Sequence, residues 1–166
     1  MRQGPTTLKD GNRAAAVADA DGVIRFGRYV FKTASEPDEL DQLHRLNYET
    51  FVREVAQHAD NGAGVLIDKF HDKNTYFVAL LDGKVVGMVS VHDAAPFSIA
   101  DKLPDPAILS KLGPRPLEVR LLAIHPEHRG RALVGGLGLA VFRHAQRSGH
   151  SHLLISAYAE ELRMYK

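Results

Sequence analysis

Residues 117–137, LEVRLLAIHPEHRGRALVGGL, decide the fold of this chain. They predict a buried strand over Leu117–Ile124, then a basic turn containing Gly130, then the start of a helix with one apolar face. Such a turn directs several backbone N–H groups and a helix N-terminus at one point, which suits a phosphate group. Arg129 and Arg131 place positive charge beside that point. The stretch therefore predicts an enzyme that holds a phosphorylated carrier.

Composition excludes several other classes of protein. The 166 residues are 45% hydrophobic, enough for a packed core, and 21 basic residues nearly balance 20 acidic ones. A net charge of +1 argues against bulk electrostatic capture of nucleic acid or of a membrane surface. The absence of cysteine removes disulfides, zinc–thiolate sites and thiol nucleophiles. It also fits a reducing compartment, and we expect a cytoplasmic protein.

The chain reads as one domain preceded by a tail. Residues 1–22 are small, polar and aperiodic, and we expect them to form a flexible tail outside the fold. They lack the apolar core of a signal peptide, and no apolar run in the chain reaches the ~20 residues of a membrane span. Residues 23–166 form the expected domain.

Periodicity within this domain predicts strands alternating with helices. The Asp82-Gly83 pair between two apolar runs is a strong hairpin signal, and four prolines in 94–115 indicate a long connection. The order implies a mixed α/β or α+β sheet. The expected elements are a strand at Arg28–Thr33, a helix from Pro37 to about Val55, strands at Thr75–Leu81, Lys84–His92 and Leu117–Ile124, a helix at Leu133–Ser148, a strand at His152–Ser156 and a helix at Ala159–Lys166.

The octapeptide Ile124–Arg131, IHPEHRGR, resembles motif A of the Gcn5-related N-acetyltransferase (GNAT) superfamily. That pattern is an apolar strand followed by V-x-P-x-x-[RQ]-x-x-G-x-[GA]. Pro126 and Arg129 match it in spacing, whereas Ala132 stands at a usual glycine and Val134 at a usual Gly or Ala. The resemblance covers about residues 23–166. It implies a mixed, mostly antiparallel sheet flanked by helices.

The resemblance also implies where acetyl-CoA or coenzyme A would bind. In the superfamily, the backbone at the end of this strand pairs with the pantetheine arm, and the following turn holds the pyrophosphate through N–H groups. Val134 would bring a β-branched side chain where the carrier approaches closely. The positions implied are Leu122, Ala123 and Ile124 for the arm, and Arg129, Gly130, Arg131, Ala132, Leu133, Val134 and Gly135 for the pyrophosphate.

A second resemblance is to one GNAT branch, the N-acyl amino acid synthases and acyl-homoserine-lactone synthases. It is carried by Tyr48–Glu54 (YETFVRE), Asp68–Asp72 (DKFHD), Tyr76 and Gly87. Members of this branch can take long acyl groups from acyl carrier protein. This chain has Ser90-Val91 where the branch often has Arg-Leu.

Two residues are candidates for catalysis. Glu118 alternates onto one face with Arg120, Leu122 and Ile124. A carboxylate on this strand often serves the superfamily as general base, but a simple Glu118–Arg120 pair is the alternative. Tyr165 resembles the superfamily tyrosine that protonates the departing thiolate, and a phenol with an ordinary pKa near ~10 is protonated at neutral pH. Its alternative role is packing and hydrogen bonding.

The nine histidines do not predict a metal site. His125 and His128 flank the turn at i and i+3, but no third ligand stands at a telling spacing, so we expect solvated loop histidines and no metal.

Three functions stay open from the sequence. The first is an acyl-CoA-dependent N-acyltransferase, most often acetylating, with a small-molecule amine as acceptor. The second is an N-acyl amino acid synthase that uses acyl carrier protein, and the third is a GNAT-like module that binds without turnover. Lys166 precedes the strands that usually complete this sheet, so we expect a sheet without its C-terminal strands. The chain is then a fragment of a longer protein, or a neighbouring chain completes the sheet, and the exposed edge would favour a homodimer.

Overall fold

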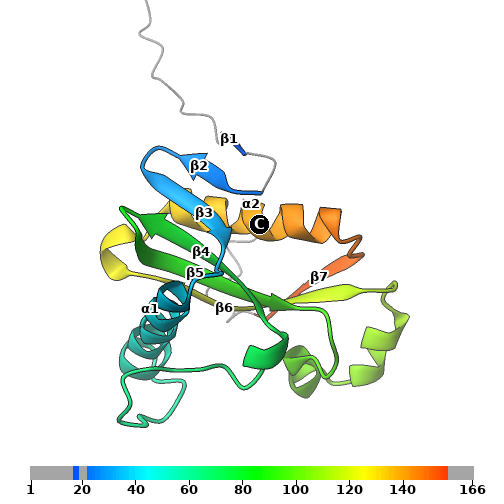
Figure 1. The fold of residues 1–166 in the computed structure, drawn as a ribbon. Coiled ribbons are helices and arrows are strands. Elements are labelled where there is room, and N and C mark those ends of the chain that lie inside the picture. The colour runs from blue at the N-terminus through cyan, green and yellow to red at the C-terminus, as the bar shows by residue number, and fades with distance from the viewer. Residues whose placement is uncertain (1–16, 19–21, 157–166) are drawn as a thin grey trace, which may run out of the picture.

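The computed structural model describes residues 17–18 and 22–156, and Figure 1 shows their arrangement. Two α-helices, a short π-helix and four 3₁₀ turns connect the strands in this part of the chain. In chain order the elements are β1 (Val17–Ala18), β2 (Ile24–Phe26), β3 (Tyr29–Thr33), α1 (Pro37–Tyr48), the π-helix η1 (Glu49–Glu54), η2 (His71–Lys73), β4 (Thr75–Leu81), β5 (Lys84–His92), η3 (Ser98–Lys102), η4 (Pro106–Lys111), β6 (Pro116–Ile124), η5 (Pro126–His128), α2 (Arg131–Arg147) and β7 (His152–Ile155).

The described strands form one seven-stranded sheet in the order β1 to β7. Neighbours from β1 to β6 pair antiparallel, and only β6 and β7 pair parallel. Helix α1 packs on one face of the sheet and α2 on the other (Figure 1). This mixed, mostly antiparallel sheet flanked by helices confirms the predicted fold class.

Local sequence explains the best-predicted elements. Strands β4 and β5 have the expected bounds, and both Asp82 and Gly83 take positive φ angles (50° and 80°), as a tight hairpin turn between twisted strands requires. Helix α1 begins at Pro37. The Glu39 carboxylate accepts hydrogen bonds from the backbone N–H groups of Ser35 and Glu36 just before it.

Each face of the sheet carries its own hydrophobic cluster. On the α2 face, Phe31 of β3 packs so closely against the helix that a Cβ on Gly136 would lie 2.2 Å from its ring. Glycine at 136 is therefore what lets α2 approach the sheet. The α1 face is more polar, because buried Asn47 and Ser90 interrupt its apolar side chains.

Several expected segments differ in detail. Val17–Ala18, inside the segment expected as a tail, pairs with β2. The connection 94–115 contains two 3₁₀ turns, η3 and η4. The expected helix at Ala159–Lys166 lies outside the described residues. Among the described helices, none combines the length and apolar character needed to cross a membrane.

Candidate functional site

Strand β6 carries an open edge at its C-terminal half. On one side it pairs with β5 as far as Ile124, but on the other it pairs with β7 only from Pro116 to Val119. Beyond Val119 no described strand pairs with that second edge, so backbone groups of residues 120–124 that do not point toward β5 are candidates for pairing with a ligand. The carbonyls of Arg120 and Ile124 are excluded, because they already accept hydrogen bonds from Ser90 Oγ and Arg129 Nε. The expected arm-binding residues Leu122, Ala123 and Ile124 lie here.

A β-bulge shapes this open edge. Ser90 pairs with Arg120 and Met88 with Ala123, so Leu121 and Leu122 together lie opposite Val89. Leu121 takes a φ of 42°, which is strained for a leucine and is typical of backbone held for a function.

The bulge also changes which face of the sheet the residues after it occupy, so the expected arrangement of strand faces was wrong. Glu118 and Arg120 face α1, but beyond the bulge it is Ala123 that joins the α1 cluster. Leu122 and Ile124 pack on the α2 side instead. Strict alternation predicted that Leu122 and Ile124 share a face with Glu118. The extra residue of the bulge shifts the alternation by one, so they lie on the opposite face.

The N-terminus of α2 follows directly after the η5 turn. Gly130 caps it, and the first backbone bond within the helix runs from Val134 N to Gly130 O (3.3 Å). The N–H groups of Arg131, Ala132 and Leu133 therefore have no partner within the helix, and they carry the positive end of its dipole. The 17-residue helix α2 thus presents free N–H groups at the turn where a phosphate is expected, and the phosphate itself stays a prediction.

The substituted positions of the motif lie in different environments. Val134 is partly buried and packs against the α2-side core, so its side chain contributes to the fold. Leu133 is buried in the same cluster. Ala132 and Gly135 are exposed, and a Cβ on Gly135 would meet nothing within 4 Å. Open space is thus found at Gly135, one position after the valine.

The two motif arginines differ in availability. Arg129 forms a bidentate ion pair with Glu54 of η1, with Nη1 2.6 Å from Oε1, and its Nε donates to the carbonyl of Ile124 (3.2 Å). Hydrogen bonding to Arg129 lowers the pKa of the Glu54 carboxyl. Arg131 is exposed and forms no ion pair with any described residue, so it is the arginine free to meet a phosphate.

Glu118 is enclosed by neighbours. Its carboxylate accepts hydrogen bonds from Ser98 N (2.8 Å), Ser98 Oγ (2.7 Å) and Ile99 N (2.7 Å). Nε2 of His92 lies 2.9 Å from its Oε2, and Glu118 is 1% exposed. Burial lowers the pKa of His92, although the adjacent carboxylate opposes this. Glu118 therefore fixes the 98–99 segment against β6, and its role as base stays a prediction.

The alternative Glu118–Arg120 pair does not form, because each residue has another partner. Arg120 donates to both carboxylate oxygens of Asp68, from Nε (3.0 Å) and Nη2 (2.9 Å). Tyr165, the predicted acid, lies outside the described residues.

The pair of Asp68 and Arg120 is the centre of a polar network whose pairings the sequence did not predict, although Asp68 and Tyr76 carry the resemblance to the acyl-synthase branch. Asn74 donates to Asp68 (2.7 Å) and approaches the Tyr76 hydroxyl (3.3 Å), which also lies 3.0 Å from Nδ1 of His71. Burial disfavours ionised Asp68, but hydrogen bonds from Arg120 and Asn74 outweigh burial and lower its pKa. Arg120, a charged residue within an apolar strand, was the sequence feature that indicated such a network, because a buried charge needs a partner.

A groove of about 600 Å³ runs beside the motif turn, between that turn and the helical segment 42–54. Its lining combines the apolar Leu46 and Val85 with the charged Arg45, Glu49 and Arg53. The full lining is Gln42, Arg45, Leu46, Glu49, Thr50, Arg53, Glu54, Val85, His125 and Pro126.

Comparison with known proteins gives one family match. The model of the family described as N-acyl amino acid synthase FeeM matches residues 42–166. This range contains the open edge of β6, the bulge and the N-terminus of α2. No curated protein matches the chain in sequence at a significant level.

Solved structures share the fold at low sequence identity. FeeM, an N-acyl amino acid synthase from uncultured soil microbes, matches with a TM-score of 0.66 and 21% identity, over 83% of this chain and 76% of FeeM. The acyl-homoserine-lactone synthase LasI matches with a TM-score of 0.67 and 16% identity, over 82% of this chain and 76% of LasI. A predicted acetyltransferase with acetyl-CoA from Clostridium acetobutylicum matches with a TM-score of 0.55 and 10% identity, over 82% of this chain and 86% of the acetyltransferase. These likenesses confirm the predicted resemblance in fold to GNAT proteins and to their acyl-synthase branch.

Proposed function

The chain belongs to the family of the N-acyl amino acid synthase FeeM and is an acyltransferase, and we propose that it acylates the amino group of an amino acid. The observation that carries this proposal is the family match over residues 42–166, which spans the open strand edge and the helix N-terminus. The donor we propose is an acyl thioester of phosphopantetheine, carried by coenzyme A or by acyl carrier protein.

The donor is held through backbone groups. Its phosphate accepts hydrogen bonds from the free N–H groups at the start of α2, with Arg131 as the neighbouring cation. Its pantetheine amides pair with backbone groups of the open edge of β6 at residues 122–124, other than the Ile124 carbonyl, which already accepts from Arg129. The thioester carbonyl then lies near the bulge, where Leu121 and Leu122 have no register partner in β5, and we propose a backbone N–H of the bulge as the donor to the developing oxyanion.

The transfer is direct. The amine nitrogen attacks the thioester carbon, the C–S bond breaks, the amine loses one proton and the thiolate gains one. We keep Tyr165 as the proposed acid for the thiolate. Because both oxygens of Glu118 already have partners, Glu118 can take the amine proton only by giving up a contact with the 98–99 segment or with Nε2 of His92.

A second candidate function is acetylation of a small amine with acetyl-CoA. It is consistent with the exposed Arg131 beside a helix N-terminus, which suits a pyrophosphate as well as a single phosphate. The two functions share one site and differ in donor and acceptor.

Product analysis separates them. Purified protein is incubated with acyl-CoA or acyl carrier protein thioesters of two to sixteen carbons and an amino acid mixture, and products are identified by mass spectrometry. N-Acyl amino acids support the proposal, whereas acetylated amines alone support the second candidate. Coenzyme A binding without any transfer would overturn both.

Two arginines of α2 provide matched variants. Arg131→Gln removes the cation at the phosphate end, and Arg147→Gln removes one at the other end of the same helix. We expect KM for the donor to rise about tenfold in Arg131→Gln and to stay unchanged in Arg147→Gln.

A further inference from the structure

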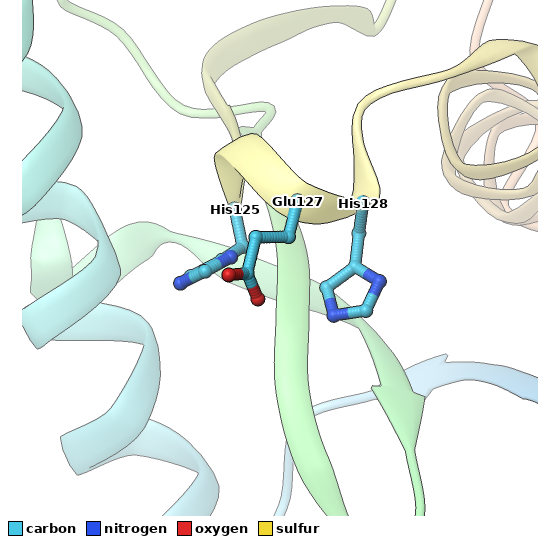
Figure 2. A group of neighbouring side chains, drawn as sticks. All are labelled: His125, Glu127 and His128. Carbon is cyan, nitrogen blue, oxygen red and sulfur yellow. The ribbon is translucent and has the colours of Figure 1, made fainter.

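The η5 turn gathers two histidines and a carboxylate. His125, Glu127 and His128 project from the same side of this turn (Figure 2), and their potential ligand atoms all lie within 4.8 Å of one another. It is the one such group of three that the described residues contain. The His125 and His128 ring centroids are 5.7 Å apart.

The backbone beneath these side chains is fixed. His125 N donates to the Val86 carbonyl of β5 (2.9 Å), which ties the start of the turn to the sheet. His128 N donates to the His125 carbonyl (2.8 Å), which closes the turn, and Pro126 fixes a φ angle within it. The three side chains therefore need only rotamer changes to converge.

The side chains are available for a ligand. None of the three forms a side-chain hydrogen bond or an ion pair with a described residue; the contacts found are between rings, His128 with Tyr29 and with His125. His125 and Glu127 are exposed and His128 is half-buried, so an ion would displace water rather than a protein partner.

The chemistry of the donor set selects the class of ion. Two imidazole nitrogens and one carboxylate oxygen match the three-ligand sites of Zn²⁺, which leave a fourth position to water. Bond lengths of about 2.0–2.2 Å place ligand atoms of a tetrahedral site about 3.4 Å apart, closer than their present upper limit and within reach of rotation about χ1 and χ2. Oxygen-seeking Mg²⁺ and Ca²⁺ are disfavoured by the two imidazoles.

We propose that His125, Glu127 and His128 bind one Zn²⁺-class divalent ion on the turn between β6 and α2. This replaces the expectation, drawn from spacing alone, that these histidines are merely solvated. The bound ion would clamp the turn that precedes the phosphate-binding end of α2, beside the groove that His125 lines. The proposal rests on the turn itself and is independent of the donor or acceptor of acyl transfer.

Calorimetric titration of tag-free protein with Zn²⁺ tests the site, with Co²⁺ absorption as a probe of coordination geometry. We expect one ion per chain at micromolar affinity, at least tenfold weaker binding in His125→Ala and in His128→Ala, and a smaller loss in Glu127→Gln. His58→Ala and His150→Ala, which change histidines outside the turn, serve as controls and should bind Zn²⁺ like the parent.

A thermal readout keeps the test decisive if a variant is poorly behaved. Zn²⁺ should raise the Tm of the parent, because it binds the folded turn, and should leave the Tm of His125→Ala/His128→Ala unchanged. Circular dichroism of that double variant without metal verifies its fold. Absence of saturable one-to-one binding in the parent, or equal binding in the folded double variant, would overturn the proposal.

Discussion

Arg129, in the turn before α2, forms a bidentate ion pair with Glu54, which lies 75 residues earlier in the π-helix η1. The same guanidinium donates to the carbonyl of Ile124 at the end of β6. One side chain thus connects the helical segment 49–54 to the turn that precedes α2. A π-helical turn often marks a functional position, and here it carries the carboxylate that orients Arg129.

Replacing Glu54 with Gln tests this connection. Both partners are about half exposed, with side chains at 45% and 43%, so loss of the pair should cost at most about 1 kcal/mol of stability. We expect KM for the acyl donor to rise several-fold, because the turn loses its fixed arginine. Arg28→Gln breaks the more exposed Arg28–Asp82 pair and is the control. Equal kinetic effects in the two variants would contradict the connection.

Glycines of α2 should respond oppositely to alanine. Gly136→Ala drives a methyl group into the Phe31 ring and should destabilise the protein by about 1–3 kcal/mol. Gly138→Ala meets open space and should stabilise the helix by up to about 1 kcal/mol. Gly135→Ala should stabilise similarly, yet weaken donor binding if the carrier lies against this helix turn. Chemical denaturation measures the changes in stability, and calorimetry measures the change in donor binding.

The buried pair of Asp68 and Arg120 should make the stability of the protein depend on pH in the acidic range. The pKa of folded Asp68 lies below its ordinary value of about 3.9, so its contribution is complete above that pH and is lost as the pH falls through the lower folded pKa. Asp68→Asn leaves Arg120 without its charge partner and should cost about 3–5 kcal/mol at pH 7. Urea titrations between pH 7 and 2 should show a shallower decline for this variant. Asp93→Asn, at an exposed carboxylate, should retain the parental slope.

The role of Glu118 can be determined by comparing substitutions at Glu118 and at Ser98, which donates a hydrogen bond to it. If Glu118 positions the 98–99 segment, both Glu118→Gln and Ser98→Ala should destabilise the protein by about 1–3 kcal/mol and speed proteolysis of residues 94–115, because each breaks buried hydrogen bonds. A base role instead predicts that Glu118→Gln alone abolishes the acidic limb of the kcat/KM pH profile. Denaturation and pH profiles on the same two variants decide between the roles.

Much of the fold follows from patterns that are local in sequence. The hairpin of β4 and β5 was predicted residue for residue, since Asp82 and Gly83 adopt the positive φ angles of its turn. The strand before the motif and the helix after it also matched, because each carries its own periodicity and the turn needs no distant contact.

Residue pairing could not be predicted in the same way. Arg120 stands two residues from Glu118 yet binds Asp68, 52 residues earlier, because the sheet presents both strand residues to different loops. The bulge at Leu121 then turns Leu122 and Ile124 to the opposite face. Neither outcome has a signature in the strand itself, since a one-residue shift depends on the register with β5.

The sequence alone therefore determined that this chain folds as a mixed sheet with a basic turn leading into a helix. Short-range backbone preferences and apolar periodicity suffice for those features. Within the described residues, tertiary structure decided which motif arginine forms an ion pair, which carboxylate is enclosed and which strand edge has no partner strand. These depend on what packs opposite each side chain, and burial makes a charged or polar group take whatever partner the fold brings within reach.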